Sequence, residues 1–212
     1  MTKLNTWLEK TKPLIAVIVI DDLSHAVPMA KALVAGGIHL LEITLRTEVG
    51  LAAIKQIRDQ VPEAIVGAGT VCNVKDYQSA IDAGAQFIVS PGLTTDLIEK
   101  AKQVESAGQW DGVFLPGVAT ASEIMVAKQA GFAQLKCFPA SAIGGCSILK
   151  AWAGPFDSVG FCPTGGISLD NYQSYLSLPN VICIGGSWLT EASLMTTENW
   201  PEIELRAKTI QA

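Results

Sequence analysis

Short apolar runs alternate with helix-length amphipathic segments along the whole chain of 212 residues. The runs are rich in β-branched and aromatic residues and mostly lack polar alternation, which is typical of strands covered on both faces. They span residues 14–20, 38–44, 65–70, 86–90, 112–116, 132–138, 158–162 and 181–184. The segments between them predict helices over 24–35, 47–60, 74–83, 94–107, 119–130, 147–153, 168–178 and about 201–210. This alternation predicts an α/β fold with a parallel sheet.

Glycines mark the ends of several predicted helices. Gly36, Gly84 and Gly131 each follow an alanine and stand just before the next apolar run. They recur at nearly equal intervals, and two strand–helix units of about 24 residues fit into each interval. Eight such units in a chain of this length predict a closed (β/α)8 barrel, the TIM-barrel architecture.

No linker, charge run or low-complexity tract divides the chain, which predicts a single barrel domain over residues 1–212. The segment before Pro13 predicts a short extra helix, with Trp7 and Leu8 covering one end of the barrel. A doubly wound open sheet is the alternative. Gly67-Ala-Gly69 resembles the start of a dinucleotide-binding loop, but it lacks the third glycine and follows the third strand rather than the first.

Charge and hydropathy exclude several classes of function. Lys plus Arg number 15 against 20 acidic residues, giving a net charge of −5, whereas proteins that bind nucleic acid through phosphate contacts are usually basic. The longest aliphatic run, Leu14–Ile20, is far shorter than a membrane span. We therefore expect neither a nucleic-acid partner nor a membrane partner, and the first residues show no pattern of a signal peptide.

The cysteines and histidines argue against a disulfide framework or a metal site. The five cysteines are dispersed and contain no CxxC spacing, and the two histidines, His25 and His39, stand apart. A reducing, cytoplasmic environment fits this pattern, and no metal is expected.

Lys136 is the most unusual residue of the predicted strands, because it lies within the sixth apolar run with apolar neighbours on both sides. If its side chain points into the barrel, loss of hydration disfavours the ammonium form and leaves a neutral amine. Such an amine can attack a ketone and form a Schiff base. The alternative is a lysine that is paired with an interior carboxylate or that faces water.

Glu42 and Arg46 belong to the second predicted strand and its end. Glu42 interrupts an apolar run, and a carboxylate inside a barrel can transfer protons; alternatively, it only neutralises Lys136 or Arg46. A guanidinium at the end of the strand suits a carboxylate or phosphate of a substrate. The alternative for Arg46 is a surface ion pair with Glu48.

Two glycine turns follow the last two predicted strands. Their sequences are Pro163-Thr164-Gly165-Gly166-Ile167-Ser168 and Ile184-Gly185-Gly186-Ser187-Trp188. Glycines allow backbone N–H groups to approach an anion, and the loops after strands 7 and 8 are where barrels commonly bind phosphate. The two turns together therefore indicate a phosphate-binding site.

Several motifs together resemble the class I family of 2-keto-3-deoxy-6-phosphogluconate aldolases, which also cleave 4-hydroxy-2-oxoglutarate. The resemblance covers most of the chain. It is carried by residues 25–37, 41–48 (LEITLRTE), 61–70 (VPEAIVGAGT), 84–87, 90–93 (SPGL), 136–140 (KCFPA), 161–168 (FCPTGGIS) and 183–189 (CIGGSWL). Cys137 and Ser141 depart from the family pattern, in which an aromatic residue and a glutamate are common at these positions.

The resemblance implies a role for each candidate residue. Lys136 would be the Schiff-base lysine and Glu42 the general acid and base. Arg46 and Thr70 would contact the pyruvate half of the substrate. The pocket lining would come from Pro91 and Phe138, and the phosphate would be held by the two glycine turns, namely Thr164, Gly165, Gly166, Gly185, Gly186 and Ser187.

The resemblance further implies a homotrimer that uses no metal or other cofactor. Its expected partner is a small 2-keto acid, phosphorylated or not, and the expected reaction is a step of the Entner–Doudoroff pathway. Two other readings of the same barrel stay open: a phosphosugar isomerase or synthase that forms no imine, and a phospho-ligand binding protein without catalytic activity.

Overall fold

The computed structural model describes residues 2–108 and 110–210. Its strands pair in parallel throughout and form two sheets. The larger sheet has six strands in the order β5-β4-β3-β2-β1-β9, and the smaller has the order β6-β7-β8. The strands are β1 (Leu14–Ile18), β2 (Leu40–Thr44), β3 (Ile65–Gly69), β4 (Phe87–Val89), β5 (Val113–Leu115), β6 (Gly117–Val118), β7 (Gln134–Cys137), β8 (Gly160–Pro163) and β9 (Ile184–Gly186).

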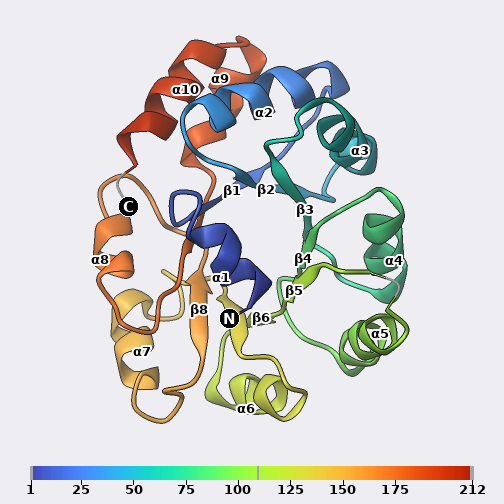
Figure 1. Ribbon diagram of the computed structural model, residues 1–212. Coiled ribbons are helices and arrows are strands. Elements are labelled where there is room, and N and C mark those ends of the chain that lie inside the picture. The colour runs from blue at the N-terminus through green and yellow to red at the C-terminus, as the bar shows by residue number, and fades with distance from the viewer. Residues whose placement is uncertain (1, 109, 211–212) are drawn as a thin grey trace.

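Helices surround these central strands (Figure 1). They are α1 (Lys3–Leu8), α2 (Ala26–Ala35), α3 (Gly50–Gln60), α4 (Val74–Asp82), α5 (Thr95–Ser106), α6 (Ala121–Gln129), α7 (Gly145–Trp152), α8 (Tyr172–Leu176), α9 (Ala192–Thr196) and α10 (Trp200–Thr209), with short 3-10 helices η1 (Leu23–His25) and η2 (Trp188–Thr190). The predicted α/β fold is thus confirmed. None of the helices in the described part of the chain is both long and apolar enough to cross a membrane.

The two sheets approach each other at both edges. Pro116 alone separates β5 from β6, and its carbonyl accepts a hydrogen bond from the Lys136 N–H at 2.8 Å. At the other edge, isolated parallel bridges join Phe161 to Val181 and Thr164 to Gly185. The strands therefore form a curled parallel arrangement, and a complete eight-stranded barrel stays a prediction.

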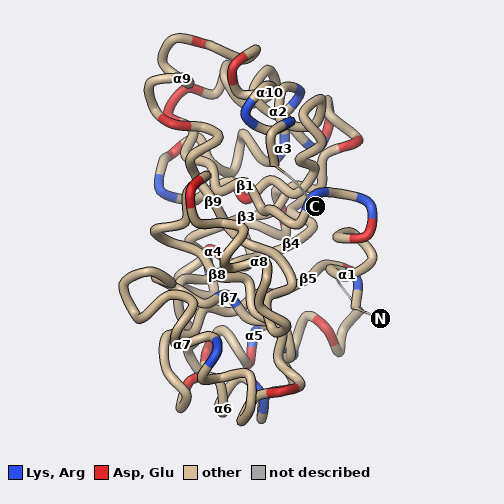
Figure 2. The backbone as a smooth tube through the Cα atoms, turned by 90° about the vertical axis from the view of Figure 1, so that its left-hand side faces the viewer, with Lys and Arg blue, Asp and Glu red and all other residues tan. Residues whose placement is uncertain are grey.

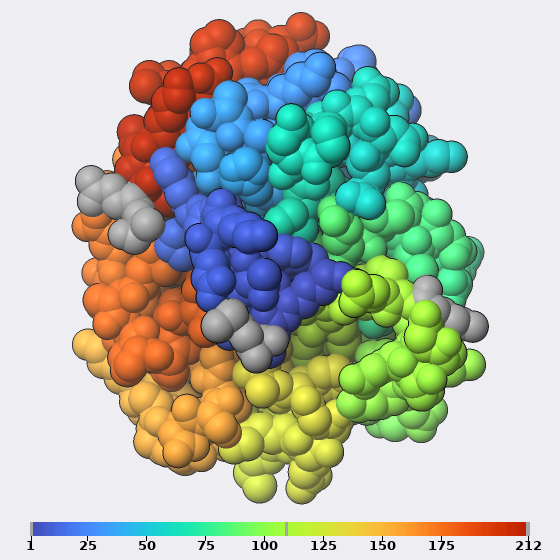
Figure 3. Space-filling model, viewed as in Figure 1, coloured from blue at the N-terminus to red at the C-terminus, as the bar shows by residue number. Residues whose placement is uncertain are grey.

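The predicted N-terminal helix is present as α1, and it lies across one end of the strands. Leu4 is 2% exposed and packs in an interior cluster with Ile15, Leu40 and Phe87, and Trp7 and Leu8 pack against the same cluster. In the space-filling view, the first residues cover the middle of this face (Figure 3). Because these strand residues lie near the amino ends of their strands, the opposite, carboxyl end is left for a functional site.

Local signals at the helix ends explain why the elements begin and end where they do. Thr120 caps α6 through a reciprocal capping box with Glu123. Gly37, Gly84 and Gly131 follow the ends of α2, α4 and α6 with φ of +87°, a left-handed conformation that side chains disfavour. The predicted glycine signal is therefore confirmed at Gly84 and Gly131, whereas after α2 the left-handed residue is Gly37 and not Gly36, which has a φ of −80°.

Candidate active site

Glu42 on β2 and Lys136 on β7 are the only charged residues in the strands of the described chain. Figure 2 shows that most other charged residues lie on the surrounding helices and loops. The fold brings these two side chains together: Lys136 Nζ donates to Glu42 Oε1 at 3.2 Å. Their side chains are only 6% and 3% exposed, so Lys136 points inward as predicted.

Strand register defines the neighbours of each member of the pair. Lys136 lies between Gly117 on β6 and Cys162 on β8, while Glu42 lies beside Val17 on β1. Nζ of Lys136 also lies 5.1 Å from the centre of the Phe138 ring, within the range of a cation–π contact. The Lys136 amine therefore has one carboxyl group and one aromatic ring as neighbours, and a proton can pass directly between the two side chains.

Arg46 and Thr70 follow β2 and β3 at the carboxyl edge of the sheet. Arg46 Nε donates to Thr70 Oγ1 at 3.3 Å, and the described residues show no ion pair between Arg46 and Glu48. Thr70 has a φ of 60°, which is uncommon for a β-branched residue. The last residues of these strands, Thr44 and Gly69, pair with each other. Arg46 and Thr70 therefore lie beyond the carboxyl ends of β2, which carries Glu42, and of β3.

The glycine turn after β8 lies against β9, because Gly185 and Gly186, which were expected in a turn, are the last two residues of that strand. Thr164 bridges to Gly185, and Gly165 and Gly166 have φ of 96° and 74°. Thr164 Oγ1 donates to the Cys162 carbonyl at 3.4 Å, so its side chain stays within the turn. Gly186 follows Gly185 in β9, and the exposed Ser187 precedes η2. The fold thus brings together the two turns that the sequence indicates as a phosphate site.

Pro91 contacts the strand that lies next to Lys136. It follows β4, and its carbonyl carbon and oxygen pack against Gly117, which is the strand neighbour of Lys136. The Gly117 N–H donates to the buried Ser90 hydroxyl at 3.3 Å and fixes this approach. Phe138 therefore adjoins the lysine directly, whereas Pro91 contacts its strand neighbour Gly117.

Three thiols are buried near the candidate pair. A hydrogen bond with Cys162 and burial raise the pKa of the Cys183 thiol well above its usual range. Burial and the neighbouring Cys162 raise the pKa of Cys137 to about 12. Both thiols therefore stay protonated near neutral pH and are weak nucleophiles.

Sequence reasoning missed the purpose of the glycines on β3. Gly67 faces Phe87, and a Cβ atom on Gly67 would clash with that ring. Gly67 therefore provides space inside the fold rather than a turn for a dinucleotide. Glycines two residues apart on a strand share one face, and this spacing was the signal that could have revealed an interior role.

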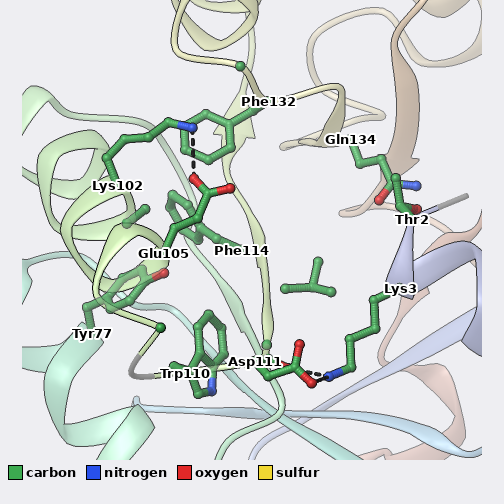
Figure 4. Close-up of a pocket in the computed structure, with 15 residues that line it drawn as sticks. Thr2, Lys3, Tyr77, Lys102, Glu105, Trp110, Asp111, Phe114, Phe132 and Gln134 are labelled. Carbon is green, nitrogen blue, oxygen red and sulfur yellow. Dashed lines mark hydrogen bonds and ion pairs between the residues drawn. The ribbon is translucent and has the colours of Figure 1, made fainter.

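Two pockets of comparable volume differ in their position relative to Lys136 and Glu42. A pocket of about 510 Å³ lies beside α1 and α5, away from the pair, among Tyr77, Trp110, Phe114 and Phe132 (Figure 4). Its lysines are already paired with acids, Lys102 with Glu105 and Lys3 with Asp111.

The other pocket, of about 560 Å³, adjoins the candidate site. It is lined by Val17 and Ser187 among others, and Val17 is the strand neighbour of Glu42. Within the described chain, no group of three or more His, Cys, Asp or Glu side chains is placed to hold a metal ion.

Comparisons with known proteins agree with this geometry. The family model described as KDPG and KHG aldolase matches residues 6–205. The KHG/KDPG aldolase of Escherichia coli is 50% identical over 198 residues, which are 93% of this chain and 90% of that protein.

Two solved structures share the fold and much of the sequence. A KDPG aldolase from Legionella pneumophila, with pyruvate captured as a covalent carbinolamine, has a TM-score of 0.92 and 40% identity and covers 100% of this chain and 99% of its own. A 2-keto-3-deoxy-6-phosphogluconate aldolase from Zymomonas mobilis, solved with 3-phosphoglycerate, has a TM-score of 0.87 and 42% identity. The match covers 98% of this chain and 96% of the Zymomonas chain. The chain therefore belongs to the KDPG and KHG aldolase family of Schiff-base aldolases, which are carbon–carbon lyases.

Proposed function

We propose that the chain cleaves 2-dehydro-3-deoxy-6-phosphogluconate to pyruvate and glyceraldehyde 3-phosphate, and 4-hydroxy-2-oxoglutarate to pyruvate and glyoxylate. The observation that carries this proposal is the buried contact of 3.2 Å between Lys136 Nζ and Glu42 Oε1. It supplies an amine and a proton-transfer group at one point, which is what imine chemistry on a 2-keto acid requires.

The reaction follows from these two side chains. Lys136 attacks C2 of the keto acid as a neutral amine, and loss of water gives an iminium ion that draws electrons from the neighbouring bond. Glu42 accepts the proton of the C4 hydroxyl as the C3–C4 bond breaks, and the aldehyde leaves. The enamine on Lys136 then takes up a proton at C3, and water releases pyruvate and the free amine.

The other candidate residues have supporting roles in the proposal. Arg46, hydrogen-bonded to Thr70, is placed to attract the carboxylate of the pyruvate half. Pro91 and Phe138 line the space beside the lysine. The phosphate is assigned to the two joined glycine segments. Gly165 and Gly166 contribute a left-handed backbone whose N–H groups suit an anion, and Thr164, Gly185, Gly186 and Ser187 are its further neighbours.

Larger-scale features form part of the same proposal. We infer a single-domain (β/α)8 barrel over residues 1–212, supported by the contacts that link the two sheets at both edges. A homotrimer and the use of no cofactor follow from the family resemblance. A cytoplasmic location is supported by the five cysteines, which are free and dispersed.

Incubation with pyruvate and borohydride tests the proposal. Intact-protein and peptide mass spectrometry should find one reduced pyruvyl group on Lys136. The adduct should vanish in Lys136→Ala and persist in the control Lys150→Ala, which alters an exposed lysine on α7. A wild-type protein that gains no adduct would favour the isomerase, synthase or binding-protein alternatives.

A further inference from the structure

We propose that Gly69 is a positioning residue for the reaction, because the space left by its missing side chain is where the Glu42 carboxyl lies. This inference rests on the proposed function of Glu42. It assigns a role in catalysis to a residue that has no functional group of its own and that touches neither the lysine nor the expected substrate.

The distances around Gly69 carry the inference. A Cβ atom built on Gly69 would lie 2.6 Å from Cγ and 2.8 Å from Cδ of Glu42, and it would be closer still to Oε1. Carbon atoms in proteins make contact at about 3.5–4.0 Å. Even the smallest side chain at position 69 is therefore incompatible with the observed position of the carboxyl.

The direction of the Glu42 side chain explains why Gly69 matters. In the strand register Glu42 is paired with Gly67, whereas Gly69 is paired with Thr44. The Glu42 side chain nevertheless lies against Gly69, so it leans along the strand toward the carboxyl end. This lean directs the carboxyl toward the end of the sheet where Arg46 and Thr70 lie.

The backbone around Gly69 has little freedom to relieve a clash. β2 and β3 are paired along five residues each, and the Leu45 N–H donates to the Gly69 carbonyl at 2.9 Å beyond the ladder. The φ of Gly69 lies outside the left-handed region, so an alanine there is not strained by its own backbone. The group that must move is the Glu42 side chain, which would lose its contact of 3.2 Å with Lys136.

Two other glycines provide matched controls. Gly67 faces the same interior from the same strand, but a Cβ atom there would meet the Phe87 ring and not Glu42. Gly67→Ala therefore introduces a comparable packing fault without moving the carboxyl. A Cβ atom on Gly154 would have no neighbour within 4 Å, so Gly154→Ala controls for the substitution itself.

A double-mutant cycle on turnover tests the inference. We expect Gly69→Ala to lower kcat by at least about tenfold, with pyruvate still trapped on Lys136, because attack on the ketone needs only the amine. In a Glu42→Gln background the same change should alter the residual rate by less than about twofold, because the carboxylate is already absent. Gly67→Ala should lower the rate by a similar factor in both backgrounds.

Two results would overturn the inference. One is a Gly69→Ala protein with wild-type kcat, and the other is an equal fold-loss from Gly69→Ala with and without Glu42. If Gly69→Ala is too destabilised for the assay, its lowered Tm, or the lack of any thermal transition, is compared with the Tm of Glu42→Ala/Gly69→Ala, in which the clashing atoms are removed. Recovery of Tm supports the assigned clash, and continued loss contradicts it. This stability measurement does not depend on activity. Failure of the proposed function, seen as a wild-type protein that gains no adduct, can therefore be distinguished from failure of the inference about Gly69.

Discussion

Glu42 is the residue whose replacement should separate imine formation from bond cleavage. In Glu42→Gln the side chain keeps its shape but can no longer accept a proton. We expect turnover to fall by about 10²–10⁴-fold, the usual contribution of a positioned general base. Trapping of pyruvate on Lys136 should persist at least in part, because nucleophilic attack does not need the C4 proton to be removed.

Steady-state cleavage and borohydride trapping, run on the same preparation, check this prediction. Glu48→Gln is the matched control, since Glu48 also lies near the end of β2 but is not paired with Lys136. Full turnover in Glu42→Gln would remove this carboxylate from the mechanism.

The sequence made Lys136 and Glu42 candidates but could not show that they meet. Each is a charge inside an apolar strand, which is costly unless it is paired or functional. Their contact joins positions separated by 94 residues, and only the curl of the sheets creates it. The spacing of Gly67 and Gly69 could have indicated an interior face, but it could not show that the Glu42 carboxyl lies in the space beside Gly69.

At the scale of elements, the long periodic helices were predictable and the segments around the site were less so. The predicted helix 74–83 is observed as α4, Val74–Asp82, with Asn73 as its cap. The predicted helix 168–178 is observed only as Tyr172–Leu176. The reason is local: the Asn171 side chain accepts from the Ser168 N–H and donates to the Gly166 carbonyl, and these bonds replace a first helical turn.

The strands at the edges of the sheets show the same limit. The predicted strand 112–116 is observed as β5, Val113–Leu115, and Pro116 then interrupts pairing before β6. Proline has no N–H group and cannot complete a ladder, although its carbonyl still bonds to β7. The short α9 and η2 were not predicted, because elements of five and three residues are too short to show helical periodicity.

Helix α1 should be important for stability and unimportant for chemistry. Leu4 is almost fully buried against Ile15, Leu40 and Phe87, so Leu4→Ala removes packed volume from the interior. We expect a loss of about 2–5 kcal/mol in the free energy of unfolding. Pyruvate trapping on Lys136 should stay intact below the melting temperature, because α1 covers the opposite end of the strands.

Chemical denaturation checks this prediction, with Leu205→Ala as the control. Leu205 lies on α10 and is 58% exposed, so its truncation should change stability by less than about 0.5 kcal/mol. Equal stabilities for the two variants would show that α1 does not contribute to the core.

At the scale of the whole molecule, the distribution of apolar side chains bears on the expected homotrimer. Several large apolar side chains are more than a third exposed, namely Val19, Val74, Met125, Val126, Leu169 and Leu205. Met125 and Val126 are neighbours on α6, whose Ile124 and Ala127 are already buried. Exposed apolar area costs roughly 25 cal/mol per Å², which association would recover.

Light scattering after size-exclusion chromatography should therefore give about three times the 22.4 kDa mass of one chain. The mass should stay constant between low salt and about 0.5 M NaCl, since apolar contacts are not screened by ions. Association through ion pairs between chains would respond differently, because salt screens the attraction between opposite charges and would weaken the trimer. A mass of one chain at micromolar concentration would rule out the trimer, while a trimer that dissociates as the salt concentration rises would locate the interface in oppositely charged rather than apolar surface.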